Sequence, residues 1–160
     1  MTVRSRVCGS VLVIVGTALV AAACASSEMM KVGSGDPVAD RQRLMKNVGA
    51  NWADIQAKAK ANNFEAIAVN ADTLALNAMH VPALFPKGSL TDKSKAKPEI
   101  WQKWDEFVKV AKNLETQSEK LRDTARAKKN DEVQAMLKDF GRNVCGACHT
   151  PFRVPPPQRS

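Results

Sequence analysis

The chain has 160 residues, and its 24 lysines and arginines outnumber 16 aspartates and glutamates, so its formal net charge is +8 at pH 7. A chain of this length suffices for one domain and excludes a large multidomain protein. The basic residues are spread along the sequence without a dense block, whereas nucleic-acid binding requires a concentrated basic face. Nucleic acid is therefore not an expected partner.

The N-terminus has the order of a bacterial secretory signal. Arg4 and Arg6 precede an apolar run over residues 11–23, and small residues follow it. This run is shorter than the roughly 20 residues that a membrane span requires, which disfavours an uncleaved anchor. We expect residues 1–24 to be a cleaved signal and the mature protein to be periplasmic.

Two modes of cleavage fit the small residues at the end of this signal. Residues 20–24 resemble a lipobox, in which Cys24 becomes the lipidated first residue and tethers the protein to a membrane. Ala21 stands where such a motif usually has leucine. Ordinary cleavage after Ala23 or Ala25 fits equally well, so the sequence leaves both alternatives open.

After a flexible tether over residues 25–36, structure is predicted to begin at Pro37. Asp36 is a favourable N-cap, and proline suits the first helical position. The next residues place a side chain on one common face every three or four positions, which is typical of a helix. This stripe consists of Arg41, Met45, Val48, Trp52, Ile55 and Ala59.

Three more amphipathic helices are predicted. The second covers residues 64–78, a proline-containing connection covers 81–97, the third covers 98–129, and the fourth runs from a cap-like Asn130 to Pro151. No stretch alternates with a period of two for long enough to form a strand. We therefore expect an all-α four-helix bundle over residues 37–154, followed by a Pro-rich tail over 155–160. Its small, alanine-rich core would gain from a large apolar cofactor.

The central motif lies near the C-terminus, where Cys145, Cys148 and His149 form the pattern C-x-x-C-H. This pattern is typical of c-type haem attachment. Two thiols three residues apart lie on one helical face and can add to the two vinyl groups of one porphyrin. The imidazole of His149 directly follows the second thiol and can coordinate the iron.

Three other interpretations of the cysteine pair are weaker. A thioredoxin-like pair opens a helix after a strand, whereas this pair closes the last helix of an all-α chain. A zinc site normally has four protein ligands, and only His80 remains beyond the motif. A disulfide is chemically open to an exported protein, but it would not require His149.

On these residues the chain resembles the cytochrome c-prime family, the class II c-type cytochromes with their low-spin relatives, over residues 38–153. Four segments carry the resemblance: 41–46 (RQRLMK), 82–86 (PALFP), 97–101 (KPEIW) and 145–153 (CGACHTPFR). The resemblance implies an antiparallel four-helix bundle that encloses one covalently attached haem c.

The resemblance also implies that a first-helix residue lies on the iron face opposite His149, and Met45 is the matching position. As in the low-spin relatives, its soft thioether would be the second axial ligand and would raise the potential. The alternative is that Met45 only packs over a vacant site. It lies on the apolar stripe, where methionine usually fills a core.

Two arginines are implied in haem binding by the same resemblance. Arg41 would reach a haem propionate through a charge-assisted contact, and Arg43 is a competing candidate. A solvated helix arginine is the alternative for each of them. Arg153 follows His149 by four residues and would lie along the proximal face of the haem.

These residues favour an electron-transfer protein with redox proteins of the cell envelope as partners. The alternative is a five-coordinate haem protein that binds nitric oxide or carbon monoxide. No distal histidine or acid–base pair is evident near Met45, so an enzyme is not predicted. The basic surface is either solvated or a docking face for an acidic redox partner. The resemblance further implies that the chain can pair as a homodimer.

Overall fold

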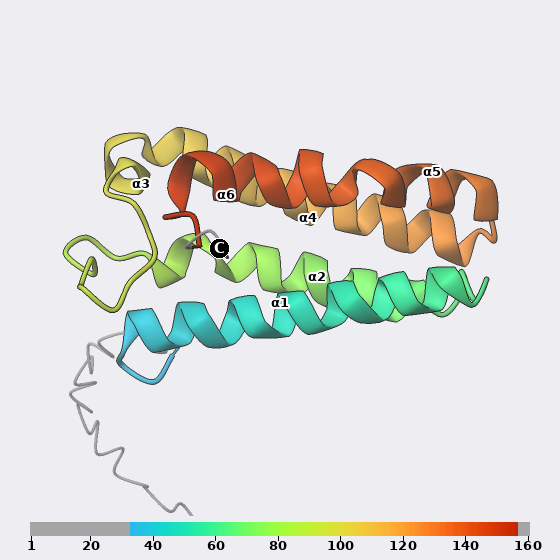
Figure 1. Cartoon of the computed structure of the whole chain (residues 1–160), viewed down its shortest axis with the longest axis horizontal. Helices are drawn as coiled ribbons and strands as arrows, with labels where there is room; N and C mark the ends of the chain where they lie inside the picture. The colour runs from blue at the N-terminus through green and yellow to red at the C-terminus, as the bar shows by residue number, and fades with distance from the viewer. Residues whose placement is uncertain (1–32, 157–160) are drawn as a thin grey trace, which may run out of the picture.

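The computed structural model describes residues 33–156, so the predicted signal and most of the tether lie outside the described residues. The elements are α1 (Pro37–Lys60), α2 (Ile67–His80), a 3-10 turn (Pro82–Leu84), α3 (Glu99–Gln102), α4 (Trp104–Arg126), α5 (Asn130–Phe140), a π turn (Gly141–Cys145) and α6 (Gly146–Phe152). In Figure 1, α1, α2, α4 and the continuous α5–α6 segment lie along one common axis. The predicted all-α four-helix bundle is confirmed.

The first helix begins where its sequence predicts. Oδ1 of Asp36 accepts hydrogen bonds from the N–H groups of Val38 at 2.9 Å and Ala39 at 3.1 Å. Pro37 takes the first helical position. Such a cap satisfies N–H groups that the first turn leaves free, and it stabilises a helix by about 1 kcal/mol. At the other end, Asn62 adopts a φ of 56°, a left-handed conformation that asparagine tolerates.

Two helix boundaries differ from the prediction. The third helix is not continuous, because Lys103 leaves helical geometry, with φ −122° and ψ 49°, and separates α3 from α4. Asn130 is the first residue of α5 and not its cap, and the preceding residue makes no side-chain cap. In a continuous helix, Trp104 would lie on the same face as buried Ile100. The break at Lys103 turns α4 about its axis relative to α3, and Trp104 is 37% exposed.

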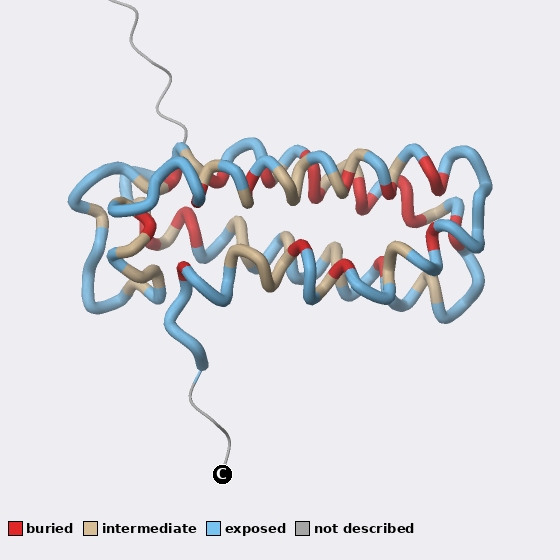
Figure 2. Tube along the Cα trace, turned by 90° about the horizontal axis from the view of Figure 1, so that it is seen from above, coloured by how far each residue is buried: buried red, intermediate tan, exposed pale blue. Residues whose placement is uncertain are grey.

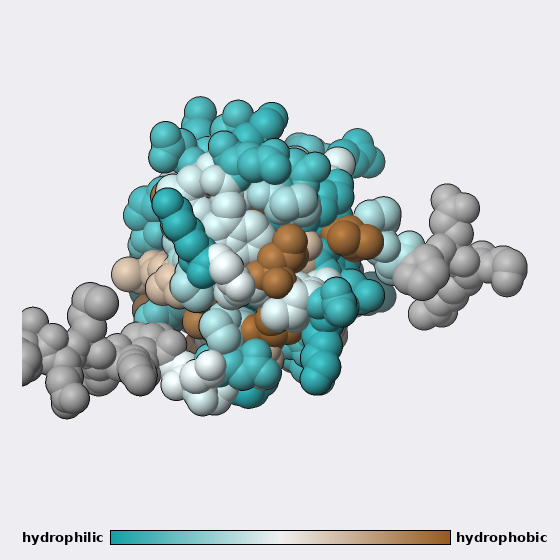
Figure 3. All heavy atoms as spheres, turned by 90° about the vertical axis from the view of Figure 1, so that its left-hand side faces the viewer, coloured by the Kyte–Doolittle hydropathy of each residue, from teal (hydrophilic) through white to brown (hydrophobic). Residues whose placement is uncertain are grey.

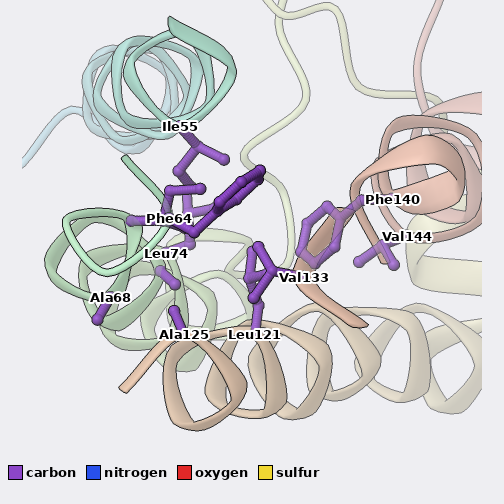
Figure 4. Close-up of a cluster of buried hydrophobic side chains, with 11 residues drawn as sticks. Ile55, Phe64, Ala68, Leu74, Leu121, Ala125, Val133, Phe140 and Val144 are labelled. Atoms are coloured by element: carbon purple, nitrogen blue, oxygen red, sulfur yellow. The ribbon is translucent and has the colours of Figure 1, made fainter. Parts of the chain in front are cut away.

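The buried side chains lie on the inward faces of the helices (Figure 2) and form two clusters. The first cluster, drawn in Figure 4, consists of Ile55, Phe64, Ile67, Ala68, Ala71, Leu74, Leu121, Ala125, Val133, Phe140 and Val144. The second consists of Val81, Ile100, Phe107, Ala111 and Phe152. Each large apolar side chain buried in this way contributes about 1.5–3 kcal/mol. The second cluster is therefore the weaker half of the core.

One buried hydroxyl has no visible partner. Ser118 of α4 is 0% exposed, and its Oγ makes no hydrogen bond to any residue between 33 and 156. An unpaired buried hydroxyl costs free energy, so we expect Ser118→Ala to leave the stability unchanged or to raise it by up to about 1 kcal/mol. The urea midpoint of the purified protein measures this. A loss of more than about 1 kcal/mol would mean that the hydroxyl bonds a buried water.

Candidate haem site

A cavity of about 370 Å³ lies at the end of the bundle where α1 begins and α6 ends, the left-hand end in Figure 1. Its volume is within the range of small-molecule sites, which are concave and mostly apolar. The apolar walls come from different segments of the chain and include Val38, Val81, Phe85, Ile100, Phe107 and Phe152. Several of these residues belong to the second cluster, so the cavity extends directly from that small core.

Three side chains that can donate to a metal line this cavity: Met45 from α1, and Cys148 and His149 from α6. Partial burial, reinforced by the positive charge of Arg153, lowers the pKa of His149, although part of the residue remains exposed. The imidazole is therefore neutral near pH 7 and keeps a nitrogen lone pair for a metal. Burial also raises the pKa of Cys148 to about 11. The predicted ligand pair, Met45 and His149, thus shares one cavity.

Cys145 is the predicted attachment residue that is not among the residues lining the cavity. Its half-buried side chain packs against the first cluster, and burial raises its pKa. Cys148, three residues later, packs against the second cluster. The C-x-x-C-H motif therefore spans the boundary between the two clusters, and no disulfide joins Cys145 to Cys148.

A widened turn precedes the motif. In the π turn (Gly141–Cys145), the N–H of Gly146 bonds to the carbonyl of Gly141, five residues earlier. Such turns are rare and frequently occur at functional sites. Because this turn contains one extra residue, the side chains of α6 are rotated about the helix axis relative to those of α5. The helix then continues through Pro151 to Phe152, one residue beyond its predicted end.

The charged residues that line the cavity are all cations. They are Arg41, Lys46, Lys95 and Arg153. Among residues 33–156, no carboxylate lines it. Haem is a flat apolar ring with two carboxylate groups and an iron, so apolar walls, a basic lining and a pair of donor side chains fit this cofactor. Sequence reasoning did not single out Lys95, because only the tertiary structure brings the long connection next to α1.

Arg41 lies on the cavity wall, but its hydrogen bonds go to the connection between α2 and α3. Nη1 donates to the carbonyl oxygen of Leu84 at 3.1 Å and to Oγ of Ser89 at 2.8 Å, and Nη2 donates to the carbonyl oxygen of Ser89 at 2.8 Å. Its guanidinium carbon is 4.6 Å from the ring centroid of Phe85, within the range of a cation–π contact. Arg41 is only 7% exposed, so the alternative of a solvated arginine is wrong for this residue.

The last part of the same connection, residues 86–97, is here called the strap. At its N-terminal side the strap is held by the hydrogen bonds from Arg41 to Ser89. At its C-terminal side, the N–H of Lys97 donates to the carbonyl of Phe152 at 2.9 Å, and the N–H of Val154 donates to the carbonyl of Lys95 at 2.8 Å. The strap thus connects the start of α1 to the end of α6 and closes one side of the cavity.

We expect Arg41→Gln to lower the free energy of unfolding by about 2–4 kcal/mol, because carbonyls of the connection lose their donors at a buried position. Arg41→Lys should not restore it, since one ammonium group cannot replace the planar fork of donors. The matched control is Arg43→Gln. Arg43 pairs with Asp40 and its side chain is 59% exposed, so its loss should cost under about 0.5 kcal/mol. Equal urea midpoints for the two glutamine variants would contradict the anchoring role.

The sequence of the bundle is similar to a family model and to several characterised proteins. Residues 36–153 match the family model described as Cytochrome C'. A cytochrome c-556 from Agrobacterium tumefaciens (strain II Chrys) is 32% identical over 120 residues, which cover 73% of this chain and 96% of that protein. A cytochrome c-554 from Cereibacter sphaeroides is 34% identical over 82 residues, which cover 49% of this chain and 60% of that protein.

Solved structures agree with these relatives. The crystal structure of cytochrome c' from Thermochromatium tepidum has a TM-score of 0.68 and 25% sequence identity, and the match covers 74% of this chain and 95% of that chain. The C-x-x-C-H motif lies inside the matched residues, and the cavity beside it fits haem. By its sequence and its fold, the chain belongs to the cytochrome c' family, and its cofactor is covalently attached haem c.

Proposed function

We propose that this protein is an exported electron-transfer cytochrome and not an enzyme. In this proposal Cys145 and Cys148 attach the haem, and His149 and Met45 are its axial ligands. The observation that carries the proposal is that Met45 and His149 line one cavity from two different helices. When bound, haem supplies a one-electron couple, and ligation by methionine and histidine raises its potential.

The protein's own residues support this role in three ways. The neutral imidazole of His149 and the thioether of Met45 are both donors that suit haem iron. The apolar walls suit the flat apolar ring of the porphyrin. The basic lining favours two carboxylates, for which we propose Arg41 and Arg153 as partners. Nη1 of Arg41 donates to Leu84 and Ser89, and Nη2 donates to Ser89 and, at 3.4 Å, to Oγ of Ser94. These four bonds leave the Nε–H as the donor for a propionate.

The second candidate function is the binding of a small gas at a five-coordinate haem. Met45 packs against the second cluster, and a methionine that fills this space without bonding the iron would leave a position for a diatomic ligand. A solved structure with a TM-score of 0.67 is a nitric oxide complex of a mutant of cytochrome c prime from Alcaligenes xylosoxidans. At 24% identity, that likeness shows the shared fold and not the ligand of this chain.

An absorption spectrum of the reduced, purified protein tests the two candidates, with and without carbon monoxide. A low-spin ferrous spectrum that carbon monoxide does not change supports electron transfer and eliminates the gas-binding function. A high-spin spectrum that shifts with carbon monoxide eliminates ligation by Met45. A polypeptide without a Soret band, and with the mass of its amino acids alone, would contradict both candidates.

For location and assembly, we propose export to the periplasm, either with a lipid anchor on Cys24 or after ordinary cleavage. No helix between residues 33 and 156 has both the length and the apolar character to cross a membrane.

A homodimer is proposed because α2 carries three exposed apolar residues, Val69, Leu76 and Met79. One related structure is described as a cytochrome c' with ligand-controlled dimer dissociation. Sedimentation of the purified protein measures the assembly directly.

A further inference from the structure

The strap carries a concentration of unbalanced positive charge. Residues 86–97 contain four lysines, Lys87, Lys93, Lys95 and Lys97, and a single carboxylate, Asp92. Three of these lysines are exposed, and the fourth is half-buried. None of them forms an ion pair with another residue of the described range, 33–156; the ammonium of Lys97 donates instead to the carbonyl of Thr150 at 3.2 Å.

Two lysines near the opposite end of the bundle are balanced. Lys128 pairs with Glu65 at 3.3 Å, and Lys129 pairs with Glu132 at 3.1 Å. The basic character of the chain is therefore not uniform over its surface. Four unpaired lysines lie within the twelve residues of the strap, at the end of the bundle that contains the cavity, whereas other unpaired lysines of the described range, such as Lys60 and Lys120, are dispersed along the helices.

The charge of the strap lies at the mouth of the cavity. Five of the residues lining the cavity are exposed and therefore surround its opening: Gln42, Lys46, Lys95, His149 and Arg153. Two apolar side chains are also exposed here, Leu90 on the strap and Val154 beside it, at 43% each. Figure 3 views this end of the bundle and shows apolar residues surrounded by a largely hydrophilic surface. An apolar centre with a polar, charged rim is the general form of a protein interface.

The strap presents these lysines in a fixed arrangement. Its backbone is held by Arg41 on one side and by Phe152 and Val154 on the other. Nε1 of Trp101 also donates to the carbonyl of Phe85 at 3.1 Å and to that of Pro86 at 3.3 Å, where the strap begins. A partner that binds such a face has little backbone entropy to remove, because the loop is already ordered.

We propose that the strap, with Leu90 and Val154, is the docking surface for an acidic redox protein and that electrons pass at the adjoining cavity mouth. This inference rests on the proposed electron-transfer function and adds the chemical class of the partner. In the exchange one electron leaves one protein and reduces the other, and no bond forms or breaks. Complementary charge raises the rate of such encounters by about 10–10³-fold at low salt.

The test compares two double variants with the same change in net charge. Lys87→Glu with Lys93→Glu reverses charge on the strap, away from the residues that line the cavity. Lys60→Glu with Lys120→Glu is the matched control, because both lysines are exposed, lie outside the cavity end and have no ion pair among the described residues. Binding of fluorescent poly-L-glutamate is measured by anisotropy at about 10 mM ionic strength, where the screening length is about 30 Å. Oxidation of each ferrous protein by hexacyanoferrate(III), a trianion, and by tris(phenanthroline)cobalt(III), a trication, is followed by stopped flow.

The strap variant should lose at least about tenfold in affinity for poly-L-glutamate and in rate with hexacyanoferrate(III), and gain rate with the cobalt complex. The affinity and the oxidation rates of the control variant should change much less. The differences between the two variants should vanish near 1 M salt, where the screening length is about 3 Å. Equal changes in both variants would overturn the proposal. So would binding of the wild type to phosphatidylglycerol vesicles through these lysines without binding to poly-L-glutamate, because the face would then serve a membrane. A ferrous wild type that binds carbon monoxide rejects the electron-transfer function separately, whatever the polyglutamate result.

Discussion

The Met45→Ala variant is expected to lose the low-spin spectrum of the wild type and to bind carbon monoxide in the ferrous state, with the haem still attached. Met45 lines the cavity from α1, whereas both cysteines of the motif belong to the C-terminal segment. Removing the thioether therefore opens one iron position and leaves the attachment chemistry untouched. The absorption spectrum with and without carbon monoxide measures the change.

Two further variants separate ligation from packing at this position. Met45→Leu keeps a similar apolar volume but has no donor atom, so it should behave like Met45→Ala in the spectrum while it preserves the stability within about 1.5 kcal/mol. Met136→Ala is the matched methionine control, because Met136 packs against the first cluster and does not line the cavity. If Met45→Leu keeps the wild-type spectrum, Met45 only fills space, and gas binding becomes the better function.

Replacing both attachment cysteines, Cys145→Ala with Cys148→Ala, is expected to give mostly unfolded or haem-free protein. The second cluster has few large side chains and adjoins a cavity of about 370 Å³. Without haem, water reaches the apolar walls of this open cavity, so each large side chain there loses part of the roughly 1.5–3 kcal/mol that its burial contributes. A typical domain is stable by only about 5–15 kcal/mol, so the loss at several such side chains is a large fraction of the total.

Far-ultraviolet circular dichroism and the Soret absorbance of the exported protein measure this result. The single variants Cys145→Ala and Cys148→Ala are the useful comparison, since each keeps one thioether and His149. A double variant that is haem-free, cooperative in unfolding and as helical as the wild type would contradict the idea that the cofactor completes the core.

Regular helices and the motif could be predicted because both depend on local spacing. The apolar stripe that contains Ile55, the cap at Asp36 and the C-x-x-C-H pattern each require only residues within a few positions of one another. The break at Lys103 could not be predicted in this way, since no proline or glycine marks it. The π turn before Gly146 was missed for a similar reason, because one extra residue in a turn leaves little trace in the sequence pattern.

The hydrogen bonds of Arg41 show that contacts between residues far apart in the sequence could not be predicted. Its place on the apolar stripe and the family resemblance both directed attention to the cavity, and it does line the cavity. Its hydrogen-bond partners, however, are Leu84 and Ser89, which follow it by 43 and 48 residues. The strap has no periodicity from which its position could be derived, so contacts at this separation come only from the folded chain.

The second attachment of the strap has a consequence for the order in which the molecule is completed. Phe152 and Val154, which bond the strap through their backbones, follow His149 of the C-x-x-C-H motif by three and five residues. The hydrogen bonds beside residues 95–97 can therefore form only when α6 has docked, with Cys148 and His149 in place. The segment that attaches the haem thus also completes the wall around it.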